Sequence, residues 1–321
     1  MITDRVRGTR PPPSGTAPSA ARSARPYEPV VFPMSVPAAT HRPPPGSTSA
    51  GRASPFAAAY ARLAEVLPTL RVHTAAAGNP PRSGPGWVTA AQLAAGGPEA
   101  EEYLSREDEL LLREYGRRAR PDVVATFALH RFAWPACVLV TLPWFLCRRV
   151  PSLSAETVSF HRGSGQVSVS VGQFACLPDD PAASAHGAHP VPDEEALRAR
   201  VRGAVAGCLG GVLDGFRRRT RRGTHALWGT VTDEVTEGLW YLGHLLGEEQ
   251  RAVREAGELL PGGTPPYVRG AAFRTLTGPV GERVTTRDRA SCCLYYTLRP
   301  QDTCVTCPRT GEAERVARLC G

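Results

Sequence analysis

The chain has 321 residues, enough for one large domain or two small ones, and its formal net charge is +8. Arginine carries all of its strong positive charge, since the sequence contains no lysine. Residues 1–54 hold seven arginines against Asp4 and Glu28, a balance of +5 that leaves +3 for the rest, and this modest charge argues against nucleic-acid binding.

Residues 1–54 form a tail rich in Pro, Ser, Ala and Arg. This mixture cannot bury enough apolar surface to offset its chain entropy, so we predict that the tail is disordered. No uninterrupted apolar run follows a basic stretch there, as it would in a signal peptide. We therefore expect a cytoplasmic protein, either in solution or peripheral to the inner face of the membrane.

Helical patterns dominate from Pro55 onward, beginning with an apolar stripe after Ser54, a residue that can cap a helix. A second helix is predicted from about Asp122 to Leu146. It contains the most apolar run of the chain, "FAWPACVLVTLPWFLC", which is shorter than the roughly 20 residues that a spanning helix needs and includes two prolines. We predict a buried core helix and no transmembrane segment.

The second half of the chain adds three predicted helices and a hairpin. Asp193 precedes a long amphipathic helix, a second runs from about Ala226 to Gly247, and "EEQRAVREAGELL" forms a third. The stretch "TVSFHRGSGQVSVSV" alternates on both sides of a Gly-Ser-Gly turn, which predicts an antiparallel hairpin. The fold class is therefore α+β and mainly α-helical, with a tail at 1–54, an α-rich domain at 55–280 and a cysteine-bearing segment at 281–321.

Common catalytic signatures are absent, including the Gly-rich dinucleotide fingerprint, the P-loop and the serine nucleophile elbow. His186 and His189 could chelate a metal, but their Ala/Gly/Pro setting is typical of a plain loop. Four cysteines lie in apolar stretches and are interpreted as small core residues, namely Cys137, Cys147, Cys176 and Cys208.

The stretch "SCCLYYTLRPQDTCVTCP" places four further cysteines close together near the end of the chain. Cys304 and Cys307 form a C-x2-C turn that can present two sulfurs to one metal. Between this turn and Cys293, "LYYTL" suits a short strand and "RPQDT" a turn, so an excursion out and back can bring all four sulfurs together. Cys292 and Cys293 are adjacent, and the chain must bend there if both bind one site.

Adjacent ligands suit a cluster of two irons better than one tetrahedral ion, and four thiolates complete the coordination of a 2Fe-2S cluster. The spacing resembles the C-terminal motif of ferric-siderophore reductases of the FhuF type, in which two adjacent cysteines are followed by ten residues, a cysteine, two residues and a cysteine. Upstream, "RRGTHALWG", residues 221–229, is similar to an Arg-rich helix entry of related sequences. The resemblance implies that the cluster ligands are Cys292, Cys293, Cys304 and Cys307.

The resemblance also implies a function, the one-electron reduction of a ferric siderophore of the hydroxamate type to release Fe(II). The implied partners are the siderophore and an electron donor such as a ferredoxin or a reduced flavin carrier. Two alternatives stay open, a structural zinc site on a siderophore-related binding or biosynthetic protein and an iron-sulfur sensor.

Two groups of arginines are candidates for supporting roles. "RRRTRR", residues 217–222, is a candidate docking patch for an acidic donor or an anionic chelate. Arg283, Arg287 and Arg289 precede the cysteines, where positive charge would raise the potential of a cluster. Tyr295 and Tyr296 are candidates for shielding the site or for packing in the core.

Overall fold

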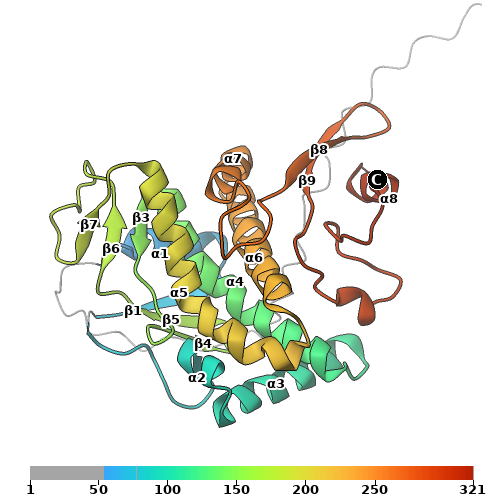
Figure 1. Ribbon diagram of the computed structural model, residues 1–321, viewed down its shortest axis with the longest axis horizontal. Helices are drawn as coiled ribbons and strands as arrows, with labels where there is room; N and C mark the ends of the chain where they lie inside the picture. The colour runs from blue at the N-terminus through green and yellow to red at the C-terminus, as the bar shows by residue number, and fades with distance from the viewer. Residues whose placement is uncertain (1–53, 77, 321) are drawn as a thin grey trace, which may run out of the picture.

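The computed structural model describes residues 54–76 and 78–320 and has an α+β fold, as the sequence predicts (Figure 1). Its helices are α1 (Ala57–Val66), α2 (Ala90–Ala95), α3 (Pro98–Tyr115), α4 (Pro121–Cys147), α5 (Glu194–Thr220), α6 (Thr224–Leu245), α7 (Glu249–Leu259), the 3-10 helix η1 (Tyr295–Thr297) and α8 (Glu312–Cys320). Apart from Ser54, the tail predicted to be disordered lies outside the described residues.

Helix α4 runs through the centre of the fold, and α5 and α6 both pack along it (Figure 1). Every residue from Val123 to Phe145 is buried, which explains why the helix is apolar on all sides. Among the described helices it alone is long and apolar enough to cross a membrane, but its apolar stretch is wholly buried inside the protein. The predicted buried core helix is confirmed.

The three helices predicted for the second half of the chain are confirmed as α5, α6 and α7. The Asp193 side chain caps α5 by accepting a hydrogen bond of 2.8 Å from the backbone N–H of Ala196. Helix α5 ends where Arg221 adopts a left-handed conformation, and α6 begins directly after Gly223. The arginines of residues 217–222 therefore lie in the last turn of α5 and in the short junction that follows it.

The strands form three small sheets, with β1 (Arg71–Ala75), β5 (Gln166–Ser170), β4 (Val158–His161) and β2 (Trp87–Thr89) in the first, β3 (Arg149–Pro151), β6 (Phe174–Cys176) and β7 (Ala188–Pro190) in the second, and β8 (Phe273–Thr277) and β9 (Arg283–Arg287) in the third. The predicted hairpin is β4–β5, with Phe160 opposite Val167. Strand β5 also pairs in parallel with β1, a contact between distant segments that no local pattern indicated.

The C-terminal part of the chain lies beside α6, away from the first two sheets (Figure 1). After the β8–β9 hairpin, residues 288–311 contain little regular structure except η1, and α8 follows. This irregular stretch carries the four clustered cysteines, so the rest of the fold must hold it in place through side chains.

Candidate metal centre

Three of the four clustered cysteines pack together where the C-terminal stretch meets α3 and α4, and Cys292 directly precedes the first of them. Cys293, Cys304 and Cys307 are buried, and Cys292 is partly exposed. The Sγ atoms of Cys293 and Cys304 are 3.8 Å apart. Two thiolates on one tetrahedral ion, each about 2.3 Å from the metal, would be separated by about the same distance. This pair is therefore spaced to share one metal ion.

Two local turns shape the backbone around the cysteines. Leu294 adopts a left-handed conformation with φ 63°, which bends the chain directly after the adjacent cysteines. The N–H of Cys307 donates to the carbonyl of Cys304 at 2.9 Å and closes the C-x2-C turn. The strand predicted for "LYYTL" is wrong, because the left-handed residue starts the 3-10 helix Tyr295–Thr297 and the Thr297 hydroxyl donates back to the carbonyl of Leu294.

The buried sulfurs differ in acidity. A hydrogen bond with Cys304, assisted by the charge of Arg289 and opposed by burial, lowers the pKa of Cys293 to about 6. A second hydrogen bond with Cys304 lowers the pKa of Cys307 to about 5. The two hydrogen bonds, with Cys293 and Cys307, raise the pKa of Cys304 itself. Burial raises the pKa of Cys292. Thiolates are the form that binds metals, so in this structure two of the four thiols favour the metal-binding form and two favour the protonated form.

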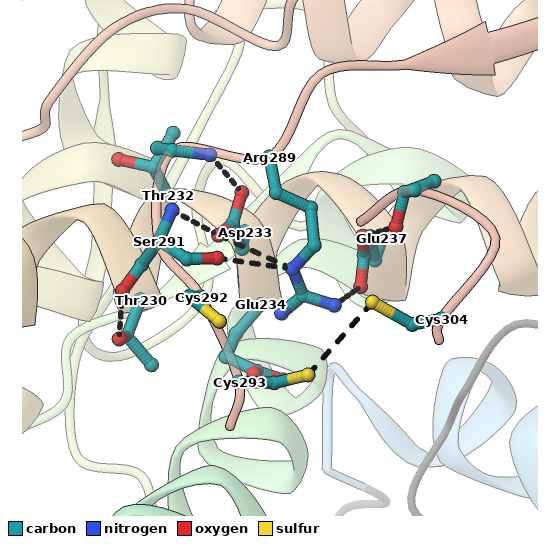
Figure 2. A network of polar contacts seen from close by, with 12 residues as sticks. Thr230, Thr232, Asp233, Glu234, Glu237, Arg289, Ser291, Cys292, Cys293 and Cys304 are labelled. Atoms are coloured by element: carbon teal, nitrogen blue, oxygen red, sulfur yellow. Dashed lines mark hydrogen bonds and ion pairs between the residues drawn. The ribbon is translucent and has the colours of Figure 1, made fainter. Parts of the chain in front are cut away.

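Two carboxylates of α6 reach the segments that carry the cysteines (Figure 2). Asp233 accepts hydrogen bonds of 2.8 Å from the backbone N–H groups of Ala290 and Ser291. Glu237 accepts one of 3.0 Å from the hydroxyl of Thr306, which lies between Cys304 and Cys307. The cysteine segments are thus fastened to a helix of the core.

Arg287 and Arg289 are buried and form ion pairs with the same two carboxylates (Figure 2 shows Arg289). Arg287 contacts Asp233 at 2.6 Å and Glu237 at 2.8 Å. Arg289 contacts Glu237 at 2.8 Å. Two positive charges therefore face two negative charges in this cluster, and the predicted effect of these arginines on the potential of a cluster stays a prediction. Arg283 is exposed on β9.

The upstream stretch "RRGTHALWG" meets the cysteine segment. Arg222 donates to the hydroxyl of Ser291 at 2.8 Å and to the carbonyl of Cys292 at 2.6 Å. Gly229 faces Ala290 so closely that a Cβ atom there would lie 3.2 Å from the Ala290 carbonyl oxygen. The two stretches that carry the family resemblance are thus adjacent in space, although about 60 residues separate them in sequence.

An aromatic and apolar wall covers another side of the site. Cys293, Cys304 and Cys307 pack in a small apolar cluster with residues of α3 and α4, among them Phe127. Tyr295 packs edge-on against Tyr115 with ring centroids 6.1 Å apart, and the guanidinium of Arg309 lies over the ring of Tyr296. Both tyrosines are partly buried, and Tyr295 packs against the apolar cluster as considered from the sequence, while the shielding role stays a prediction.

Several functional neighbours escaped the sequence analysis. Asp233, Glu234 and Glu237 all lie on α6, and all three are buried. Glu234 forms a close pair with His130 of α4. The signal was present in "TDEVTEG", where three acidic residues fall within a helix that is otherwise largely apolar. Carboxylates inside such a helix need buried partners, which His130 supplies for Glu234 and arginines from the C-terminal part supply for the other two.

The other cysteine and histidine candidates lie elsewhere. Cys137, Cys176 and Cys208 are buried as predicted, and Cys147 is partly buried. Cys320 ends α8 beside the β8–β9 hairpin, close to Gly278 and Glu282. His186 and His189 line a surface hollow next to β7. Among residues 54–76 and 78–320, no group of three or more His, Cys, Asp or Glu side chains is arranged to hold a single metal ion.

The donor set fits an iron-sulfur cluster. Its candidate ligands are all thiols, three of them are shielded from water, and the N–H of Arg309 points to the sulfur of Cys307 at 3.4 Å. Hydrogen bonds to sulfur and limited exposure are the features by which proteins adjust such clusters.

Comparison with known proteins supports this interpretation. A family model described as the FhuF 2Fe-2S C-terminal domain matches residues 289–309, a range that begins at Arg289 and includes all four clustered cysteines. The match confirms the resemblance seen in the sequence and indicates a 2Fe-2S cluster as the cofactor. A search of curated proteins found no match to the chain.

Proposed function

Because the chain carries an FhuF 2Fe-2S C-terminal domain, we propose that it reduces ferric siderophores by one electron and so releases Fe(II). The ligands in this proposal are Cys292, Cys293, Cys304 and Cys307. The observation that carries it is the contact between Cys293 and Cys304, whose Sγ atoms are 3.8 Å apart within the range that the family model matches. We place the activity in the cytoplasm, where thiols stay reduced.

The chemistry follows from the hardness of the iron ligands. Siderophores of the hydroxamate class hold Fe(III) through hard oxygen donors, which bind Fe(II) much less tightly, so the transfer of one electron loosens the iron. A 2Fe-2S cluster supplies electrons one at a time when it is bound. The role of the chain is to hold the cluster close to the surface, exclude water from its inner side and accept partners on its outer side.

The exposed side of the site suits an anionic partner. Arg222 touches the backbone of Cys292, and Arg217, Arg218 and Arg221 are exposed at the neighbouring C-terminal end of α5. Within the described residues these three arginines form no ion pair with a carboxylate. We propose that they attract an acidic electron donor, such as a ferredoxin or a reduced flavin carrier, towards the Cys292 edge.

The direct test is anaerobic stopped-flow spectroscopy. With the protein reduced beforehand, a ferric hydroxamate siderophore should reoxidise it, and a strong Fe(II) chelator should increase the extent, because removal of Fe(II) draws the transfer forward. Stoichiometric zinc without iron or acid-labile sulfide in the purified protein would overturn the proposal. So would a reduced protein that ferric salts oxidise and every siderophore class leaves unchanged.

The proposed donor surface has its own test. Reduction by an acidic ferredoxin should slow as salt concentration rises, and replacing Arg218 and Arg221 with Gln should flatten that dependence. A matched variant with Arg62 and Arg71 replaced by Gln, both exposed near the first sheet, should keep the wild-type salt profile. Equal profiles for the two variants would contradict this surface while leaving the reductase proposal intact.

A further inference from the structure

We propose that Asp233 and Glu237 of α6 are positioning residues that set the distance between the cysteine ligands. The cysteines lie on two arms, the first arm being residues 289–293 and the second arm residues 304–307. This inference rests on the proposed ligand assignment and extends it to the residues that hold the ligands in place.

Asp233 holds the first arm by its backbone. Its two carboxylate oxygens accept from consecutive N–H groups, those of Ala290 and Ser291, immediately before the adjacent cysteines. The close approach of Gly229, one turn earlier on α6, lets this arm lie directly against the helix. A carboxylate that accepts two backbone hydrogen bonds fixes both the position and the direction of the arm.

Glu237 holds the second arm through a side chain. The hydroxyl of Thr306, which is 2% exposed, donates to Oε1 of Glu237 at 3.0 Å. Thr306 stands inside the C-x2-C turn, so this bond anchors the turn that carries Cys304 and Cys307. Arg315 of α8 adds a second fastening, because it donates to the carbonyl of Cys307 at 3.1 Å.

The helix between the two anchors acts as a spacer. Asp233 and Glu237 are four residues apart and therefore lie on the same face of α6, one turn from each other. Arg287 contacts both carboxylates, as does Arg289, whose nitrogen is 3.5 Å from Asp233. All four charges are buried and balanced, so neither carboxylate can move without leaving a charge unpaired. Cys293 of the first arm and Cys304 of the second meet at 3.8 Å as a result.

The sharpest test removes one hydroxyl. Thr306→Val keeps the size of the side chain and should make loss of the 2Fe-2S absorption to an iron chelator about tenfold faster, the usual scale for losing a residue that supports a metal ligand. The electron paramagnetic resonance (EPR) spectrum of the reduced protein should also change. Thr306→Ser should restore both. Thr236→Val is the matched control, since the buried Thr236 hydroxyl donates to the carbonyl of Thr232 within α6.

A double-mutant cycle tests the route through Glu237. If Thr306 acts by bonding to Glu237, the combination of Thr306→Val with Glu237→Gln should lose iron no faster than Glu237→Gln alone. If Thr306→Val loses its 2Fe-2S absorption at the wild-type rate and has the wild-type EPR spectrum, the inference is overturned. The proposed function would still stand, because the protein would still hold its cluster. A wild-type protein without iron would instead overturn the proposed function. If Thr306→Val does not fold but Thr306→Ser behaves as wild type, Glu237→Gln alone decides by the same two measurements.

Discussion

The helical core and the C-terminal segment are each stabilised by a different kind of interaction. Around α4 the core consists of a large continuous set of buried apolar side chains from α1 to α7. The segment at 287–315 contributes a small apolar cluster, but it also buries the guanidinium groups of Arg287, Arg289 and Arg315. Apolar packing is not directional, whereas ion pairs and hydrogen bonds are. A metal site requires the second kind of attachment because its ligands must stand at fixed positions.

The largest effect expected is loss of the cofactor without loss of the core. Cys304→Ser should abolish retention of the 2Fe-2S cluster, because Cys304 stands between the sulfurs of Cys293 and Cys307. The far-ultraviolet circular dichroism of the variant should remain strongly helical, since α4 to α7 pack without this residue. Iron and acid-labile sulfide analysis provides the measurement.

Cys320→Ser is the control for this prediction, because Cys320 lies beside the β8–β9 hairpin. It should retain the cluster. A colourless Cys320→Ser protein together with a coloured Cys304→Ser protein would mean that Cys320 is a cluster ligand and Cys304 is not.

Next in size is the removal of one buried charge. Arg287→Met leaves Asp233 and Glu237 with less positive charge than negative charge in a water-free environment, which typically costs about 3–5 kcal/mol. Arg283→Met, on the same strand and exposed, should cost little. Urea unfolding and limited proteolysis of the C-terminal segment would measure the difference. Equal stabilities would mean that the ion pairs do not hold the segment.

The same contrast explains what the sequence could predict. Helix α4 was predictable from its long apolar run, α5 to α7 were predictable because apolar side chains recur at helical spacing, and Asp193 was recognisable as a cap. The four cysteines were predictable because their spacing is short-range. By contrast, the fold of "LYYTL" depends on the left-handed Leu294 and on packing against Tyr115, which no local pattern contains.

The arginines show the limit most clearly. Arg283 and Arg287 look alike in "GERVTTRDR", yet one is exposed and the other fully buried. Their difference depends on whether Asp233 and Glu237, some 50 residues earlier, lie opposite. Sequence patterns report which residues are charged, but the pairing of charges is a property of the tertiary fold.

A substitution in the apolar core should have the opposite profile to Arg287→Met. Leu209 is fully buried on α5, so Leu209→Ala should lower the free energy of unfolding by about 2–5 kcal/mol through lost apolar contact and a cavity. Because the cysteine arms are fastened to α6, the EPR spectrum of the folded protein should stay as in the wild type. A spectrum that changes as much as in Thr306→Val would show that the core and the segment are mechanically coupled.

The smallest effect concerns an ion cluster that lies in the core and away from the cysteines. Glu255 of α7 receives hydrogen bonds from Arg148 and Arg251, and these outweigh its burial and lower its pKa below the usual range. A carboxyl with a lowered pKa in the folded state adds stability above its unfolded pKa of about 4.3, and that stability is lost as pH falls through the folded value. Glu255→Gln should therefore be less stable than the wild type at pH 7, by less than Leu209→Ala, and the gap should close as pH drops below about 4. Glu258→Gln, at an exposed position on α7, should cost little stability at pH 7. If the gap instead stayed constant down to acid pH, the effect would come from packing of the side chain and not from its charge. This ion cluster would then contribute no charge-dependent stability to the core, in contrast to the ion pairs of the C-terminal segment.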